Sequence, residues 1–71
     1  MTISQDHVYI LEDGKQVLVV RKDSLHATVY YLPRRPKGFN LTTIPMKLPE
    51  RKFLAQVKRD EGPSKVEDLV W

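Results

Sequence analysis

The side chains best suited to chemistry lie in one proline-bounded segment, residues 33–40, which reads Pro-Arg-Arg-Pro-Lys-Gly-Phe-Asn. Arg34, Arg35 and Lys37 supply cations, and arginine pairs with phosphate through two parallel hydrogen bonds. Phe39 follows them, and an exposed aromatic ring can stack on an unpaired nucleic-acid base. The prolines remove backbone donors and restrict the unbound chain, so the segment predicts an irregular basic loop whose cations are partly preorganised.

Further basic residues follow this loop. Between residues 33 and 59 the chain carries eight basic residues against one acidic residue, whereas the net charge of the whole chain is only +3. Such a field attracts polyanions over about one Debye length, roughly 8 Å at physiological salt. Two adjacent tyrosines precede the loop, and because neighbours on a strand point to opposite faces, one of them should lie outward. We therefore predict binding of DNA or RNA through Arg34, Arg35, Lys37, Phe39, Tyr31, Arg51, Lys52, Lys58 and Arg59.

The extent of this surface depends on the fold. Arg51-Lys52 and Lys58-Arg59 extend the loop only if the fold brings them alongside it. Residues 60–71 carry four carboxylates against one lysine. This acidic segment either leaves the basic face uncovered or folds over it, in which case it neutralises the face or acts as an autoinhibitory gate.

Residues for catalysis or metal binding are scarce. The chain has no cysteine, and Ser4, Ser24 and Ser64 lack the glycine context of a nucleophile elbow. His7 and His26 have no ligand-like spacing, and the three glycines are too scattered to form a phosphate-binding loop. We expect a protein that is not an enzyme and that holds no cofactor or metal.

Three β-strands are expected to position the basic loop. Residues 7–12, 16–21 and 26–32 are rich in β-branched and aromatic side chains. Asp13-Gly14, between the first two, is a strong signal for a hairpin. The three segments together predict an antiparallel meander that ends where the loop begins.

The second half of the chain contains shorter elements. Residues 41–44, ended by Pro45, predict a fourth strand. We favour one helical turn at residues 49–52 and a strand at residues 53–58. A continuous helix through both ranges is the alternative, because their apolar side chains fit either period.

Gly62-Pro63 is expected to end the compact body, so that residues 1–62 form a small β-barrel domain. Residues 63–71 are then a tail or, from the capping-box spacing that begins at Ser64, a short helix. The whole pattern predicts a mainly β fold. It is typical of a small antiparallel SH3-like barrel of four to five strands, with one short helical turn and a possible C-terminal helix.

Length and composition indicate a single folded soluble domain, since 71 residues are 41% hydrophobic and 30% charged. We expect no membrane association, no signal peptide and a cytoplasmic location, because the apolar runs are far shorter than the roughly 20 residues of a membrane helix. So small a core is marginally stable, and a homodimer is one way to complete it.

The spacing of several residues resembles that in a group of known proteins. Gly14-x-x-Val17-x-Val19, then Val29-Tyr30-Tyr31, then Pro49-Glu50-Arg51-Lys52-Phe53 are similar to small uncharacterised proteins encoded in bacteriophages and prophages. The resemblance spans residues 8–58. It implies an SH3-like β-barrel and a phage or bacterial setting, and it implies no catalytic residues.

Two other functions compete with nucleic-acid binding. The chain is equally compatible with a protein-interaction module, such as a phage-encoded modulator of a host protein. That module would use an exposed sheet edge, the Pro-Arg-Arg-Pro segment, or Leu69-Val70-Trp71 as a hydrophobic anchor. The third interpretation is a structural subunit of a larger assembly.

Overall fold

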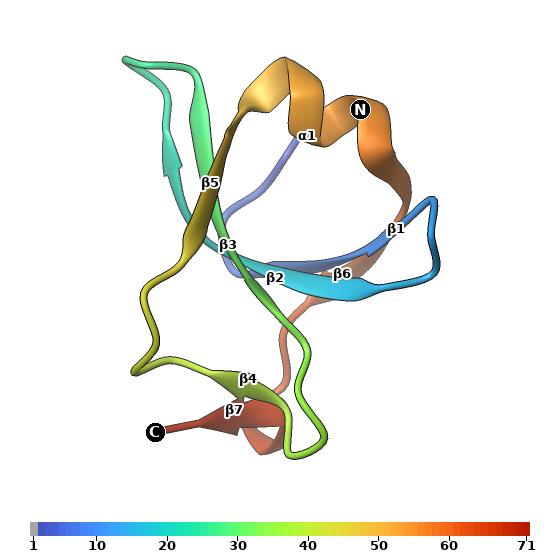
Figure 1. Ribbon diagram of the computed structural model, residues 1–71, viewed down its shortest axis with the longest axis vertical. Coiled ribbons are helices and arrows are strands. Elements are labelled where there is room, and N and C mark those ends of the chain that lie inside the picture. The colour runs from blue at the N-terminus through green and yellow to red at the C-terminus, as the bar shows by residue number, and fades with distance from the viewer. Residues whose placement is uncertain (1) are drawn as a thin grey trace.

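The computed structural model describes residues 2–71 and is mainly β, with a single α-helix in this described part (Figure 1). β5, β3, β2, β1 and β6 form an antiparallel sheet in that order, and β4 and β7 form a separate parallel ribbon. The elements in chain order are β1 (His7–Leu11), β2 (Gln16–Asp23), β3 (Thr28–Pro33), β4 (Phe39–Asn40), β5 (Met46–Pro49), α1 (Glu50–Gln56), β6 (Val57–Pro63), the 3-10 turn η1 (Val66–Asp68) and β7 (Leu69–Val70).

The expected antiparallel meander is confirmed in β1, β2 and β3. The turn after β1 places Gly14 at φ +88°, which glycine adopts without steric cost, and the Gly14 N–H donates to the Leu11 carbonyl over 2.9 Å. The Asp13 carboxylate accepts the N–H of Lys15 at 3.0 Å, a contact typical of aspartate in turns. The Asp-Gly signal therefore locates the first hairpin correctly.

A bulge in β2 changes which side chains share a face of the sheet. Val19 pairs with Tyr31, but the next pair is Arg21 with Tyr30, so Val20 is an extra residue without a partner in β3. An extra residue shifts the rest of its strand to the opposite face. Without this bulge, Arg21 would point to the side of the sheet that α1 covers.

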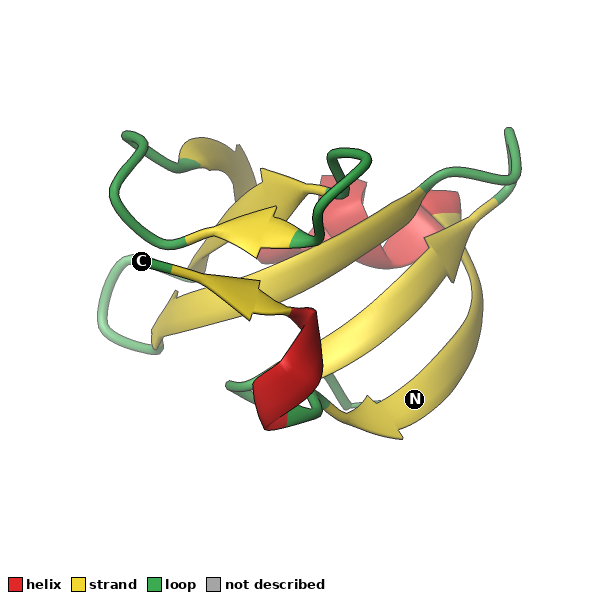
Figure 2. Cartoon of the chain, turned by 90° about the horizontal axis from the view of Figure 1, so that it is seen from below, coloured by secondary structure: helices red, strands yellow, loops and turns green. Residues whose placement is uncertain are grey.

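Two layers cover opposite faces of the sheet. Figure 2 shows the β4–β7 ribbon on the near side of the sheet and α1 on the far side. The core under α1 consists of Ile3, Tyr9, Leu11, Val17, Val19, Val29, Tyr31 and Phe53. The core under the ribbon consists of Val8, Leu18 and Phe39, against which Val20, Leu41 and Leu69 pack.

The mainly β prediction and the antiparallel sheet are confirmed, and the sheet is open. Its order begins at β5 and ends at β6, and these two edge strands do not pair with each other. The expected strand at residues 41–44 is wrong, because these residues form a turn. The side-chain oxygen of Asn40 accepts hydrogen bonds from the N–H and the hydroxyl of Thr42, at 2.9 and 2.6 Å, and holds this turn. The strand follows Pro45 instead, as β5.

The segment 49–59 contains a longer helix than we favoured, α1. α1 continues through Gln56, so the expected strand at residues 53–58 is wrong for residues 53–56. The helical conformation is favoured over a strand because it buries Phe53 and packs Leu54 against the core under α1. At its first turn, the Glu50 carboxylate lies 3.0 Å from the Lys22 ammonium and so ties α1 to β2.

The last residues return to the body of the molecule. Gly62-Pro63 does not end it, because these residues pair with His7 and Val8 of β1. The expected terminal helix is limited to η1, since Leu69 leaves the helical path to pack on the core under the ribbon. No helix in residues 2–71 combines the length and apolar character needed to span a bilayer.

Candidate functional site

The predicted basic loop is a tight hairpin, which we call the basic hairpin (residues 34–38). The N–H of Arg35 donates to the Gly38 carbonyl over 2.8 Å, and the Gly38 N–H donates back to the Arg35 carbonyl over 2.9 Å. Arg35 and Lys37 are exposed and have no carboxylate within ion-pair distance in the described chain. The hairpin therefore presents two available cations.

Arg34 is partly neutralised by the acidic segment. Its guanidinium nitrogen Nη2 lies 3.4 Å from the Asp68 carboxylate of η1. The same guanidinium stacks 5.5 Å from the centroid of the Phe39 ring, a cation–π distance. Of the two outcomes open for the acidic segment, the structure therefore has it folded against one cation of the hairpin.

Neither aromatic ring selected from the sequence is available for stacking. Phe39 is 0% exposed because its ring fills the core under the ribbon. Tyr31 is 7% exposed and packs 5.2 Å from the ring of Phe53. Alternation along β3 instead turns Tyr30 to the other face, where it is half-buried. One tyrosine of the pair does face outward, as expected, but it is Tyr30.

The remaining predicted cations do not join the basic hairpin. Arg51 and Lys52 lie on α1, at the opposite end of the molecule from the β4–β7 ribbon in Figure 1, and the longest dimension of the molecule is 29 Å. Lys58 and Arg59 lie on β6, and Arg59 pairs with Glu61 at 3.3 Å. Because exposed charges are screened beyond roughly 8 Å, Arg51 and Lys52 act separately from the hairpin, and Arg59 is partly neutralised by Glu61.

A different row of side chains combines cations with an aromatic ring. We call Arg21, Tyr30 and Lys47, from β2, β3 and β5, the open face. The Arg21 guanidinium lies 5.2 Å from the centroid of the Tyr30 ring, and Tyr30 pairs directly with Lys47. The N–H of Glu50 donates a hydrogen bond to the Ala27 carbonyl over 2.7 Å, so these two opposite residues are a hydrogen-bonded pair. Hydrogen-bonded and non-hydrogen-bonded pairs alternate along antiparallel strands, which makes Tyr30 and Lys47 a non-hydrogen-bonded pair. Side chains approach most closely in pairs of this kind.

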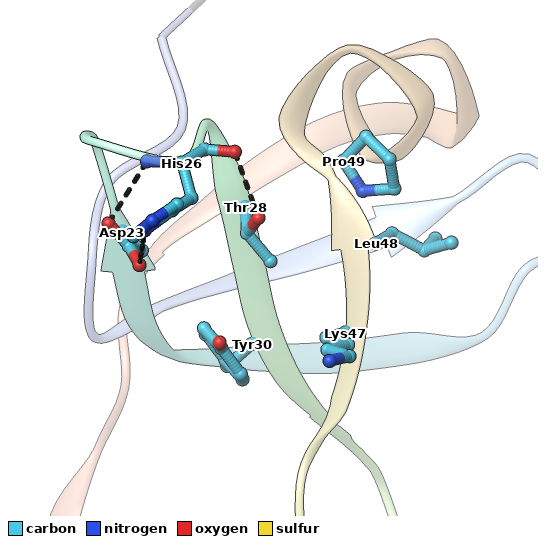
Figure 3. Close-up of a pocket in the computed structure, with 7 residues that line it drawn as sticks. All are labelled: Asp23, His26, Thr28, Tyr30, Lys47, Leu48 and Pro49. Atoms are coloured by element: carbon cyan, nitrogen blue, oxygen red, sulfur yellow. Dashed lines mark hydrogen bonds and ion pairs between the residues drawn. The ribbon is translucent and has the colours of Figure 1, made fainter.

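The open face borders a surface depression with a volume of about 570 Å³. In Figure 3, Tyr30 and Lys47 lie at one end of this depression, and His26 and Pro49 lie at the other. The residues that line it are Asp23, His26, Thr28, Tyr30, Lys47, Leu48 and Pro49. This volume is comparable to that of small-molecule sites, although the depression is open to solvent.

Asp23 contributes negative charge at the far end of the depression. Its carboxylate lies 2.8 Å from Nδ1 of His26 and accepts the His26 N–H at 3.2 Å. These hydrogen bonds hold the pKa of Asp23 below its ordinary value of 3.8. Ionised Asp23 therefore stabilises the fold, and this contribution is complete above about pH 4 and is lost as the pH falls through the lowered pKa.

Replacing His26 with alanine is expected to raise the pKa of Asp23 toward its ordinary value of 3.8, because the hydrogen bond with the His26 side chain is the main cause of the lowering. Carboxyl-carbon NMR titration measures this change directly. His7→Ala is the matched control, since His7 pairs with Asp60 instead of Asp23. An unchanged Asp23 titration in His26→Ala would contradict the assignment.

Arg21 and Lys47 were not predicted from the sequence as partners of an outward tyrosine. Strand alternation from the buried Val29 and Tyr31 could have identified Tyr30. The same alternation would have placed Arg21 on the wrong face, because nothing local marks the bulge at Val20.

The edges of the sheet are poorly suited to pairing with another strand. Ladder alternation in β5 directs the backbone groups of Lys47 and Pro49 outward, and proline has no N–H to donate. On β6, residues 58–61 are all charged, and the pairing with β1 is interrupted by two register shifts. Both devices discourage edge-to-edge association.

The apolar residues expected as a protein anchor are divided among three environments. Leu69 packs in the core under the ribbon. Val70 lines a hollow of about 290 Å³ beside the basic hairpin. Trp71 is 84% exposed, and of the three it is the one available for contact with a partner.

Comparison of the chain with protein-family models, with curated proteins and with solved structures returns no match. Within residues 2–71, no three His, Cys, Asp or Glu side chains cluster closely enough to hold a metal ion. The chemistry of the site must therefore be inferred from its own residues.

Proposed function

We propose that this protein is a small non-enzymatic regulator that binds nucleic acid in the cytoplasm, in a phage or bacterial setting. The observation that carries the proposal is the open face, where two cations flank a half-buried tyrosine ring. Cations attract phosphates and aromatic rings stack on bases, and surfaces that bind nucleic acid without strict sequence preference combine the two. Arg35 and Lys37 of the basic hairpin supply additional charge.

This interface differs from the one expected from the sequence, because the cations of α1 and β6 are not part of it. The resemblance of residues 8–58 to small phage and prophage proteins supports the setting. A three-stranded meander followed by a short strand and a short helix supports a relationship to SH3-like barrels, in a version whose sheet remains open.

Three double charge reversals test the proposal, each changing the net charge by the same amount. Arg21→Glu/Lys47→Glu alters the open face, Arg35→Glu/Lys37→Glu alters the hairpin, and Arg51→Glu/Lys52→Glu on α1 is the control. For a single strand that neutralises four cations, affinity should fall about fifty-fold between 50 and 200 mM salt. The open-face variant should bind more weakly and reduce the salt slope by about 1.4, whereas the α1 variant should bind like the wild type.

Fluorescence anisotropy with labelled 20-nucleotide DNA and RNA measures these affinities, and circular dichroism checks that each variant is folded. If the α1 variant loses as much affinity as the open-face variant, the binding is non-specific attraction to a basic protein. If the wild type binds neither DNA nor RNA, the proposed function is wrong.

Exposed apolar side chains favour a second candidate, a module that binds a host protein. Ile44 is 93% exposed and Trp71 is 84% exposed. Figures 1 and 2 both place the labelled C-terminal end beside the segment between β4 and β5, which contains Ile44.

Affinity capture from a bacterial lysate separates the candidates. A captured protein that survives nuclease treatment and is lost with Trp71→Ala would favour the second.

A further inference from the structure

We propose that Tyr30 stacks on an unpaired base, so that the ligand of the open face is single-stranded nucleic acid. This inference rests on the proposed function and names its substrate class. A base inside a duplex is stacked on both sides and has no free ring face for a tyrosine. A duplex would therefore gain only phosphate contacts from this surface.

Tyr30 is half-buried and forms part of the lining of the depression. Arg21 lies 5.2 Å from the ring centroid and is not among the residues that line the depression, whereas Tyr30 is. The guanidinium thus contacts the ring, and the part of half-buried Tyr30 that lines the depression remains accessible to a ligand. The depression has a volume of about 570 Å³, which is enough for a nucleobase and its sugar.

The charges around the depression orient the ligand. Lys47 lies beside Tyr30 at one end and has no carboxylate partner among residues 2–71. Asp23 lies at the end occupied by His26 (Figure 3). A phosphate is attracted to Lys47 and repelled by Asp23, whereas the amino and imino groups of a base are donors that a carboxylate accepts. The phosphate is therefore placed at Lys47 and the base edge toward Asp23.

Tyr30→Ala and Tyr30→Phe test this inference with a 20-nucleotide single strand and the duplex of the same sequence. Tyr30→Ala should weaken binding of the single strand about five- to hundred-fold, as expected for loss of one stacked base, and should leave the duplex affinity unchanged. Tyr30→Phe retains the ring and should bind the single strand nearly as well as the wild type. The salt slope should be the same in all three proteins, because no cation is removed.

A measurement on the wild-type protein avoids any effect of the substitution on folding. The chain has three tyrosines, and Tyr9 and Tyr31 are buried. On addition of the single strand, the ring protons of Tyr30 should shift upfield in NMR spectra while those of Tyr9 and Tyr31 remain in place.

Equal weakening of single-strand and duplex binding in Tyr30→Ala, or unshifted Tyr30 protons at saturation, would overturn the inference. The proposed function would survive that result if the open-face charge reversal still abolished binding. Absence of binding to either nucleic acid would instead remove the proposed function itself.

Discussion

Replacing Phe53 with alanine is expected to remove about half of the free energy of unfolding. Phe53 is 0% exposed and is the buried residue of α1. Its ring meets Tyr9 edge-on at 5.8 Å and Tyr31 at 5.2 Å. Removing a buried phenylalanine typically costs about 3–5 kcal/mol. A domain of this length has a total stability of roughly 4–10 kcal/mol, so the loss is about half of the total and approaches the whole only at the lower end of this range.

Urea denaturation followed by circular dichroism gives the change in the free energy of unfolding. Gln56→Ala, an exposed substitution in the same helix, is the control and should change it by less than about 0.5 kcal/mol. If Phe53→Ala lowers the free energy of unfolding by less than about 1 kcal/mol, Phe53 does not stabilise the core under α1 as proposed.

Replacing Gly38 with alanine is expected to separate β7 from β4. Gly38 has φ +121°, which residues with a side chain rarely adopt, and the strain alone costs about 1–3 kcal/mol. An added Cβ would also collide with the carbonyl oxygen of Asp68 and lie 2.9 Å from the carbonyl carbon. Because this obstacle is backbone, it cannot rotate away, and η1 must separate from the basic hairpin.

Hydrogen exchange locates this effect. The N–H of Leu41, which donates to the Val70 carbonyl over 2.8 Å, should lose its protection, whereas the amides shared by β1 and β2 should keep theirs. Gly14→Ala is the matched control, since Gly14 also has positive φ but would place a Cβ in open space. Equal effects of the two substitutions would show that strain, without the clash, is responsible.

The Gly38 result also bears on binding. The basic hairpin carries Arg35 and Lys37 on a turn that Gly38 packs against η1. If the hairpin contributes to the interface, Gly38→Ala should reduce the affinity for nucleic acid, because Arg35 and Lys37 are displaced when η1 separates from the hairpin. The open face, which lies on β2, β3 and β5, should remain intact.

Sequence patterns of neighbouring residues were sufficient to predict an element whose contacts lie close together in the sequence. Asp13-Gly14 and the flanking apolar segments located the first hairpin, because its turn and its pairing involve neighbouring residues. The same signals failed at residues 53–58, where the apolar side chains fit a helix or a strand equally well. Burial of Phe53 against Tyr9 and Tyr31 decides that choice, and those partners are distant in the sequence.

By itself, the sequence determined that the protein is mainly β, that its first three strands form a meander, and that its middle is basic. Only the tertiary structure decided where that charge is displayed. The bulge at Val20 brings Arg21 beside Tyr30, while the pairing of β4 with β7 buries Phe39 and joins Arg34 to Asp68. The physical reason is that strand and turn preferences act between neighbours, whereas the face on which a side chain lies depends on pairing with strands far along the chain.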